Sequence, residues 1–156
     1  MKRIWLAAVC VGLTATSFAQ APDKAQVFSS QSMHQEFAAL VAAAKAKGSS
    51  GTTLGDYGTH AIKISVRTAS GGAEVHEHFD DVIIVTGGEA TLITGGSLIA
   101  PHTRAGGEIG GTGIRVGRQQ TIEAGSIVHI PAGTPHQMII PKGSIFQAFV
   151  IKVHEN

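Results

Sequence analysis

Cysteine is almost absent from this sequence: Cys10 is the single example among 156 residues. Cys10 lies in a short apolar run near the N-terminus, in a segment that we expect to be removed from the mature chain. The mature chain would then hold no thiol, which excludes disulfide bridges and cysteine-based metal sites. Any bound metal would have to be held by histidine, aspartate or glutamate side chains.

Clusters of basic residues and long apolar runs are also missing. The 12 Lys and Arg residues nearly balance the 11 Asp and Glu residues, and they do not gather on one segment, which argues against a nucleic-acid partner. The apolar run from Ile4 to Leu13 falls well short of the roughly 20 residues needed to span a membrane. We therefore expect no nucleic-acid partner and no stable membrane association of the mature chain.

The N-terminus has the three parts of a secretory signal peptide. Lys2 and Arg3 precede the apolar run, and the small-residue site Ser17-Phe18-Ala19 follows it. Cleavage after Ala19 would leave about 137 residues, enough for one compact domain, and these carry ten basic and eleven acidic residues. We predict that residues 1–19 are a signal peptide and that the mature chain is periplasmic or secreted.

Residues 20–58 are predicted to precede the main domain. They comprise a polar leader, an amphipathic helix over about 32–47, and a Gly/Ser linker over 48–58. Ser32 and Gln35 form a capping-box pattern, and apolar residues recur at helical spacing from Met33 to Ala44. The polar face of this helix is not rich in bases, which favours packing on the outside of the domain over a place on a membrane surface.

From residue 59 to residue 156 the pattern is that of strands and turns. Ile62, Ile64 and Val66 alternate with polar residues, which is typical of a half-buried strand. Strands are predicted at 62–66, 73–78, 81–86, 90–93, 127–130 and 145–153, with glycine pairs between several of them. Because no helices alternate with these strands, we predict an all-β domain with a closed or sandwiched antiparallel sheet.

Two segments carry residues suited to metal chemistry. His76 and His78 lie two apart on a predicted strand, so their side chains should project from the same face. Asp81, or alternatively Asp80, would add a carboxylate just beyond a tight turn. In the second segment, a strand ends in a turn rich in Pro and Gly that presents His136. Imidazoles with a carboxylate suit Mn, Fe, Ni, Cu or Zn and leave positions open for a substrate.

Together the two segments resemble the motifs of the cupin superfamily. The second family motif, G-x5-P-x-G-x2-H-x3-N, is matched by Gly125, Pro131, Gly133 and His136, with Ile140 in the place of Asn. The first, G-x5-H-x-H-x3,4-E-x6-G, is matched by His76, His78 and Gly88. Asp81 stands in the place of Glu, one residue too early after His78, and Gly71 is one residue too close to His76.

The resemblance implies a single antiparallel, jelly-roll-like β-barrel that holds a divalent transition metal. Carried over residue by residue, the nitrogen ligands are His76, His78 and His136, and Asp81 is the oxygen ligand. A homodimer is the usual assembly of such proteins. It would also cover one face of the apolar run from Val82 to Val85, unless the N-terminal helix does so.

Two functions follow as hypotheses. The first is a metal-dependent enzyme acting on a small molecule, of the oxygenase or the isomerase/lyase type, with Glu77 and His129 as candidate acid/base residues. The alternative is a non-catalytic module that binds a small ligand or a metal. The 36 residues between Gly88 and Gly125 form a candidate lid, from which charged side chains could reach a polar substrate: Arg104, Glu108, Arg115 and Arg118.

Overall fold

The computed structural model describes residues 25–155, which form one helix and thirteen strands. The predicted signal peptide lies outside these residues. The helix is α1 (Ser30–Lys47). The strands are β1 (Ser49–Asp56), β2 (His60–Arg67), β3 (Ala73–His76), β4 (Phe79–Gly87), β5 (Glu89–Thr94), β6 (Ser97–Ile99), β7 (His102–Arg104), β8 (Glu108–Gly111), β9 (Gly113–Arg115), β10 (Arg118–Glu123), β11 (Ile127–Ile130), β12 (His136–Ile139) and β13 (Phe146–His154).

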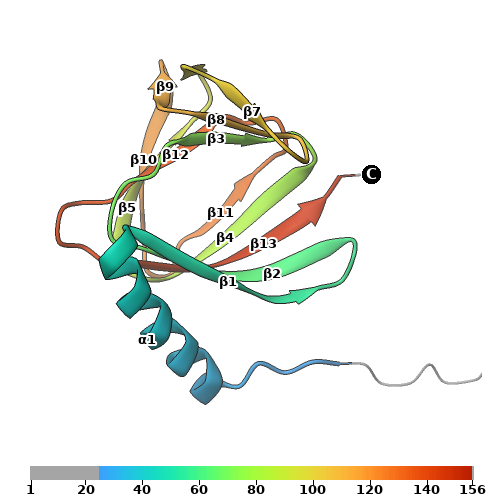
Figure 1. Ribbon diagram of the computed structural model, residues 1–156, viewed down its shortest axis with the longest axis vertical. Coiled ribbons are helices and arrows are strands. Elements are labelled where there is room, and N and C mark those ends of the chain that lie inside the picture. Colours follow the sequence, from blue (N-terminus) through green and yellow to red (C-terminus); the bar gives the residue numbers. More distant parts are fainter. Residues whose placement is uncertain (1–24, 156) are drawn as a thin grey trace, which may run out of the picture.

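Two sheets face each other and enclose the interior of the molecule (Figure 1). The first has the strand order β1-β2-β13-β4-β11, and the second has the order β10-β5-β12-β3-β8-β7. Strands β6 and β9 form a small additional ribbon. The pairings recorded among the described residues are antiparallel. The predicted all-β antiparallel barrel with one N-terminal helix is therefore confirmed.

Two segments differ from the prediction. The segment predicted as a Gly/Ser linker forms strand β1, which pairs with β2 along nearly its whole length. Its sequence, SSGTTLGD, has no apolar alternation, so the pairing with β2 and not the local pattern makes it a strand. The candidate lid over 89–124 forms β5 to β10, of which β5, β7, β8 and β10 belong to the second sheet.

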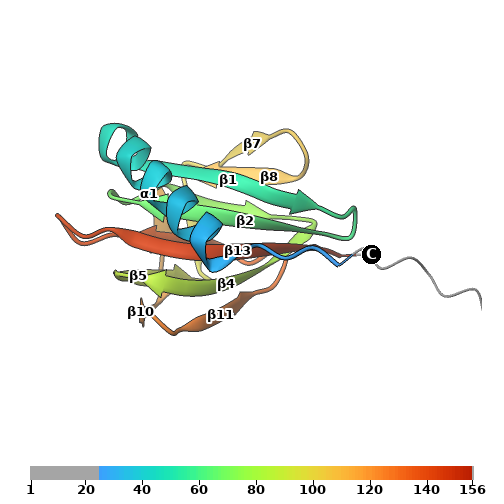
Figure 2. The ribbon, with the colours of Figure 1, turned by 90° about the horizontal axis from the view of Figure 1, so that it is seen from below.

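Helix α1 packs against the outer face of the first sheet (Figure 2). Its N-cap is Ser29, whose side chain accepts a hydrogen bond from the Ser32 backbone, so the helix begins slightly earlier than the predicted capping box. Phe37 and Phe149 meet edge to face, with 5.3 Å between ring centroids. Within the described residues, no helix is long and apolar enough to cross a membrane.

The outer packing decides which face of β2 points inward. The alternate residues Ile64 and Val66 are buried beneath α1, so the apolar face of this strand is turned outward. Lys63, Ser65 and Arg67 consequently line an interior cavity. This strand thus presents its polar face to the inside of the barrel, which the alternation by itself does not reveal.

The interior has an apolar half and a polar half. Along β13, Phe146 and Ala148 are fully buried in the apolar core, whereas Lys152 lines the cavity. The antiparallel partner β4 follows the same gradient, with Val85 in the core and Asp81 opposite Lys152. Along these two strands, polar side chains therefore gather at one end, and the other end belongs to the apolar core.

Gly88, which matches the last glycine of the first motif, joins β4 to β5. Its backbone has φ +72°, and a Cβ atom there would lie 2.1 Å from the carbonyl oxygen of Ile145. A side chain would force the two segments apart, so the tight connection between these strands requires glycine.

Candidate metal centre

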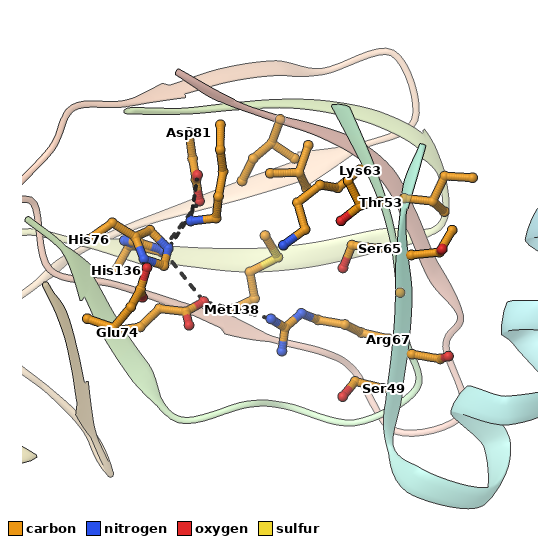
Figure 3. Close-up of a pocket in the computed structure, with 18 residues that line it drawn as sticks. Ser49, Thr53, Lys63, Ser65, Arg67, Glu74, His76, Asp81, His136 and Met138 are labelled. Atoms are coloured by element: carbon orange, nitrogen blue, oxygen red, sulfur yellow. Dashed lines mark hydrogen bonds and ion pairs between the residues drawn. The ribbon is translucent and has the colours of Figure 1, made fainter. Parts of the chain in front are cut away.

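Three side chains from two neighbouring strands converge at the polar end of the barrel (Figure 3). Glu74 and His76 lie two apart on β3, and His136 begins β12, which pairs with β3. One potential ligand atom from each of the three lies within 4.8 Å of the other two. Both histidines are buried, with 6% and 3% of their surface exposed, whereas Glu74 is partly exposed.

Asp81 approaches the same two imidazoles from the facing sheet. Its Oδ2 atom lies 3.3 Å from Nε2 of His76 and 4.0 Å from Nε2 of His136. Its other oxygen, Oδ1, lies 3.1 Å from Nζ of Lys152. A buried carboxylate requires such partners, because burial without them costs several kcal/mol.

The Nδ1 atoms of both imidazoles are occupied by acceptors. Nδ1 of His136 donates to the carbonyl oxygen of Thr134 at 3.0 Å. Nδ1 of His76 lies 2.5 Å from Oε2 of Glu108, which strand β8 brings alongside β3. In the neutral tautomer that these partners favour, Nε2 of each ring carries the free lone pair. Both Nε2 atoms face Asp81, and Nε2 of His136 also faces Glu74. Partners of this kind orient histidines that bind metals.

The spacing of the four donors suits a first-row divalent ion. Two ligands that each lie about 2.1 Å from one metal are about 3.0 to 4.2 Å apart, depending on the angle between them. The observed separations are 3.3 and 4.0 Å from Asp81 to the two imidazoles, and 3.7 Å from Glu74 to His136. Two imidazole nitrogens with two carboxylate oxygens form a donor set that suits Mn, Fe, Ni, Cu or Zn.

Without a metal, the site is held by a histidine–carboxylate pair. Burial by itself would lower the pKa of His76, but the hydrogen bond and the negative charge of Asp81 outweigh it and leave this pKa raised. Burial would raise the pKa of Asp81, but the hydrogen bond from His76 and the charge of Lys152 leave it lowered. Burial lowers the pKa of His136, so this ring favours the neutral form that binds metals.

The structure does not bring His78 to this cluster. Strand β3 ends at His76, and the turn that follows breaks the alternation on which the same-face argument depended. His78 is exposed, and its ring stacks on His154 with 6.5 Å between centroids. Asp80, the alternative carboxylate, is also directed elsewhere: it accepts hydrogen bonds from His129 and from the Ala132 backbone, each at 2.8 Å.

The donors lie in a cavity of about 570 Å³ between the two sheets. Of the four charged residues named in the candidate lid, Glu108 lines it, and Arg104, Arg115 and Arg118 are not among the lining residues. Glu77 and His129 are exposed and are not among the lining residues, so the two acid/base candidates do not face this cavity. Sequence reasoning missed Lys63, Arg67 and Lys152 as cavity residues, because the inward direction of their strands is set by tertiary packing.

Solved structures with a similar fold share little sequence with this chain. The polyketide cyclase RemF from Streptomyces resistomycificus superposes with a TM-score of 0.51 at 18% identity, covering 70% of this chain and 67% of that chain. An uncharacterized protein with a double-stranded β-helix domain from Klebsiella pneumoniae gives a TM-score of 0.51 at 15% identity, covering 69% and 78%. The chain has the cupin-type double-stranded β-helix fold.

KdgF from Halomonas sp. is a further neighbour, with a TM-score of 0.50 at 10% identity, covering 70% of this chain and 82% of that chain. The sequence matches no protein-family model and no curated protein. The cupin resemblance of the two motifs thus agrees with the fold, although overall sequence similarity is too low to show this fold.

A second register of the first motif includes Glu74 and also fits the sequence. Glu74-x-His76-x4-Asp81-x6-Gly88 satisfies the family spacing from the first histidine position onward, with Glu74 in the place of that histidine. The leading glycine is then replaced by Thr68. This register removes the one-residue misfit between His78 and Asp81. The motif search anchored on the two histidines does not consider it.

Proposed function

We propose that this protein binds one divalent transition metal through Glu74, His76, His136 and Asp81 and acts on a small molecule in the adjoining cavity. The observation that carries the proposal is the convergence of two buried Nε2 atoms and two carboxylates. Each imidazole is also held in place by a hydrogen-bond acceptor at its Nδ1 atom. His78 is not part of the proposed ligand set, because the turn after β3 leaves it exposed.

A bound metal would supply Lewis acidity toward a carbonyl or enolate oxygen, or a site for dioxygen. The residues of the chain perform the remaining tasks. Glu108 and Thr134 hold the two imidazoles in one orientation, and Lys152 neutralises the outer oxygen of Asp81. The facing wall of β2 confines the small molecule beside these donors.

Within this proposal, the reaction is of the oxygenase or the isomerase/lyase type. RemF, which shares the fold, is a polyketide cyclase, so a barrel of this type can carry catalysis. The alternative, a non-catalytic small-ligand module, is favoured by one observation. The three carboxylates that line the cavity already have a cationic or imidazole partner, so none is free to take a proton from a substrate: Glu74 with Arg67, Asp81 with Lys152, and Glu108 with His76.

Metal content and thermal unfolding test the proposed site. The chain exported by its own signal peptide should contain about one transition metal per chain, and a chelator should lower its melting temperature. His76→Ala and His136→Ala should each abolish the chelator effect. His102→Ala is the matched control, because His102 is exposed on β7 and should leave the effect intact. Equal behaviour of all three variants would refute the assignment.

Turnover distinguishes the enzyme from the binding module. Oxygen uptake and product formation should be followed with candidate diols, diketones and sugars, using metal-loaded and metal-free chain. Metal-dependent consumption of a compound supports the enzyme. Metal-dependent binding without consumption supports the module.

Export and dimerisation are also part of the proposal. Mass spectrometry of the exported chain should find cleavage after Ala19. A homodimer would cover Val82 and Ile84, which are half-buried, and Ile127, which pairs with Ile84 and is 73% exposed. Sedimentation at micromolar concentration should give twice the mass of the mature chain, and a monomer mass would count against the dimer.

A further inference from the structure

The wall opposite the candidate metal ligands carries positive charge. Lys63 and Arg67 lie on the same face of β2, and Figure 3 shows both side chains extending toward the centre of the cavity, with His76 and His136 on the other side. Ser65 lies between them on the strand, and Thr53 of β1 pairs with Lys63 in register. This wall therefore offers two cations and neighbouring hydroxyl groups, with which a purely apolar ligand would make no hydrogen bond.

Lys63 differs from the other cations that line the cavity. Arg67 lies 3.8 Å from Glu74, and Lys152 lies 3.1 Å from Asp81, so each faces a carboxylate. Among the described residues, no ion pair or hydrogen bond is recorded for the Lys63 ammonium. The charge of Lys63 is thus available to a bound molecule.

The balance of charge in the cavity also favours an anionic ligand. Three cations line it, Lys63, Arg67 and Lys152, and so do three carboxylates, Glu74, Asp81 and Glu108. With neutral histidines these charges cancel, so a divalent metal would leave the filled cavity with an excess of two positive charges. Such an excess favours an anion over a neutral molecule of the same shape.

We propose that the cavity binds a small organic anion whose carboxylate group is held by Lys63, on the wall opposite the metal ligands, while a second oxygen group faces those ligands. The inference rests on the proposed function, since both use the same cavity, and it names the class of molecule. A volume of about 570 Å³ accommodates a small organic acid with room for water.

Matched acids and alcohols test this proposal by calorimetry. Malonate, succinate and glutarate are titrated into manganese-loaded and metal-free chain, beside acetate and the neutral diols of equal length. The best dicarboxylate should bind about tenfold or more tightly than acetate and than its matching diol, because a hydrogen bond between charged groups contributes about 1.5 to 3 kcal/mol. Lys63→Gln should remove this advantage.

Two control variants isolate the charge of Lys63. Lys63→Arg retains a cation on β2 and should keep most of the preference for the dicarboxylate. Lys142→Gln removes an exposed lysine from a turn and should bind like the native chain. Thermal unfolding and manganese titration of each variant check that the fold and the metal site are unchanged.

The outcomes separate this proposal from the proposed metal site. If Lys63→Gln binds the dicarboxylate as tightly as the native chain, or if the matching diol binds equally well, the anion proposal is overturned while the metal site stands. If the native chain takes up no manganese, the metal proposal fails, and the metal-free titrations decide the anion. These metal-free titrations support the anion proposal if Lys63→Gln weakens binding of the dicarboxylate. They overturn the anion proposal if no dicarboxylate binds.

Discussion

The register that places Glu74 at the first histidine position of the first motif leads to opposite expectations for Glu74 and His78. If Glu74 is a ligand and His78 is not, Glu74→Gln should impair metal binding and His78→Ala should not. Glutamine preserves the size of the side chain and removes the charge that faces Nε2 of His136 at 3.7 Å. Replacement of His78 removes an exposed ring stacked on His154, which leaves the cavity unchanged.

The magnitude follows from linkage between binding and unfolding. A metal that binds the native state alone, at about 100 times its dissociation constant, adds about 2.7 kcal/mol of stability. For a domain of about 130 residues, with an unfolding entropy of about 2.1 cal/mol/K per residue, this raises the melting temperature by about 10 °C. Changes in residues that only support metal ligands weaken affinity by about 10-fold to 100-fold, and loss of a ligand should reach or exceed the upper value.

Thermal unfolding at one fixed metal concentration resolves the two variants. At 100-fold weaker affinity the metal is present at about its dissociation constant, so the added stability falls to about 0.4 kcal/mol and the shift to about 1 to 2 °C. The native chain and His78→Ala should both retain the shift of about 10 °C. A large loss in His78→Ala with a normal shift in Glu74→Gln would refute the register and restore His78 as the ligand.

Three further outcomes are expected. Asp81→Asn should weaken metal affinity by more than about 100-fold, measured by competition with a chelator. Asp80→Asn should change it little, and the reverse order would place the carboxylate ligand in the turn. In metal-free chain, the stability difference between native and His76→Gln should be largest between pH 3.8 and 6.5. The pKa of His76 is raised, so the stability contributed by the His76–Asp81 pair is lost as the pH rises above the pKa of His76 in the folded state. The pKa of Asp81 is lowered, so the same contribution is lost as the pH falls below the pKa of Asp81 in the folded state. His136 is present in both the native chain and His76→Gln, so its titration does not cause this difference. A stability difference that does not change with pH would contradict the His76–Asp81 pair. Phe37→Ala should cost about 3 to 5 kcal/mol in denaturant unfolding, with unchanged metal affinity, and a lost metal site would show that the helix supports the cavity.

Much of the barrel could be predicted from local pattern. The strands around Ile64, Ile83 and Phe149 were found from alternation or apolar runs, and their bounds differ from the structure by a few residues. The second motif located His136 because a turn rich in Pro and Gly has few backbone alternatives. Strand β1 was missed because its small polar residues acquire extended structure only by pairing with β2.

The candidate site depended more on tertiary structure. Sequence by itself determined that His76, His136 and a neighbouring carboxylate are present at spacings suited to one barrel end. Glu74 and His76 lie on the same face of β3, whereas His78 leaves that face because the strand ends at His76. The inward direction of Lys63 was decided by helix α1, which buries the apolar face of β2 on the outside. Alternation states that a strand has two unlike faces, but it cannot state which face meets the cavity, because that depends on what packs against each of them.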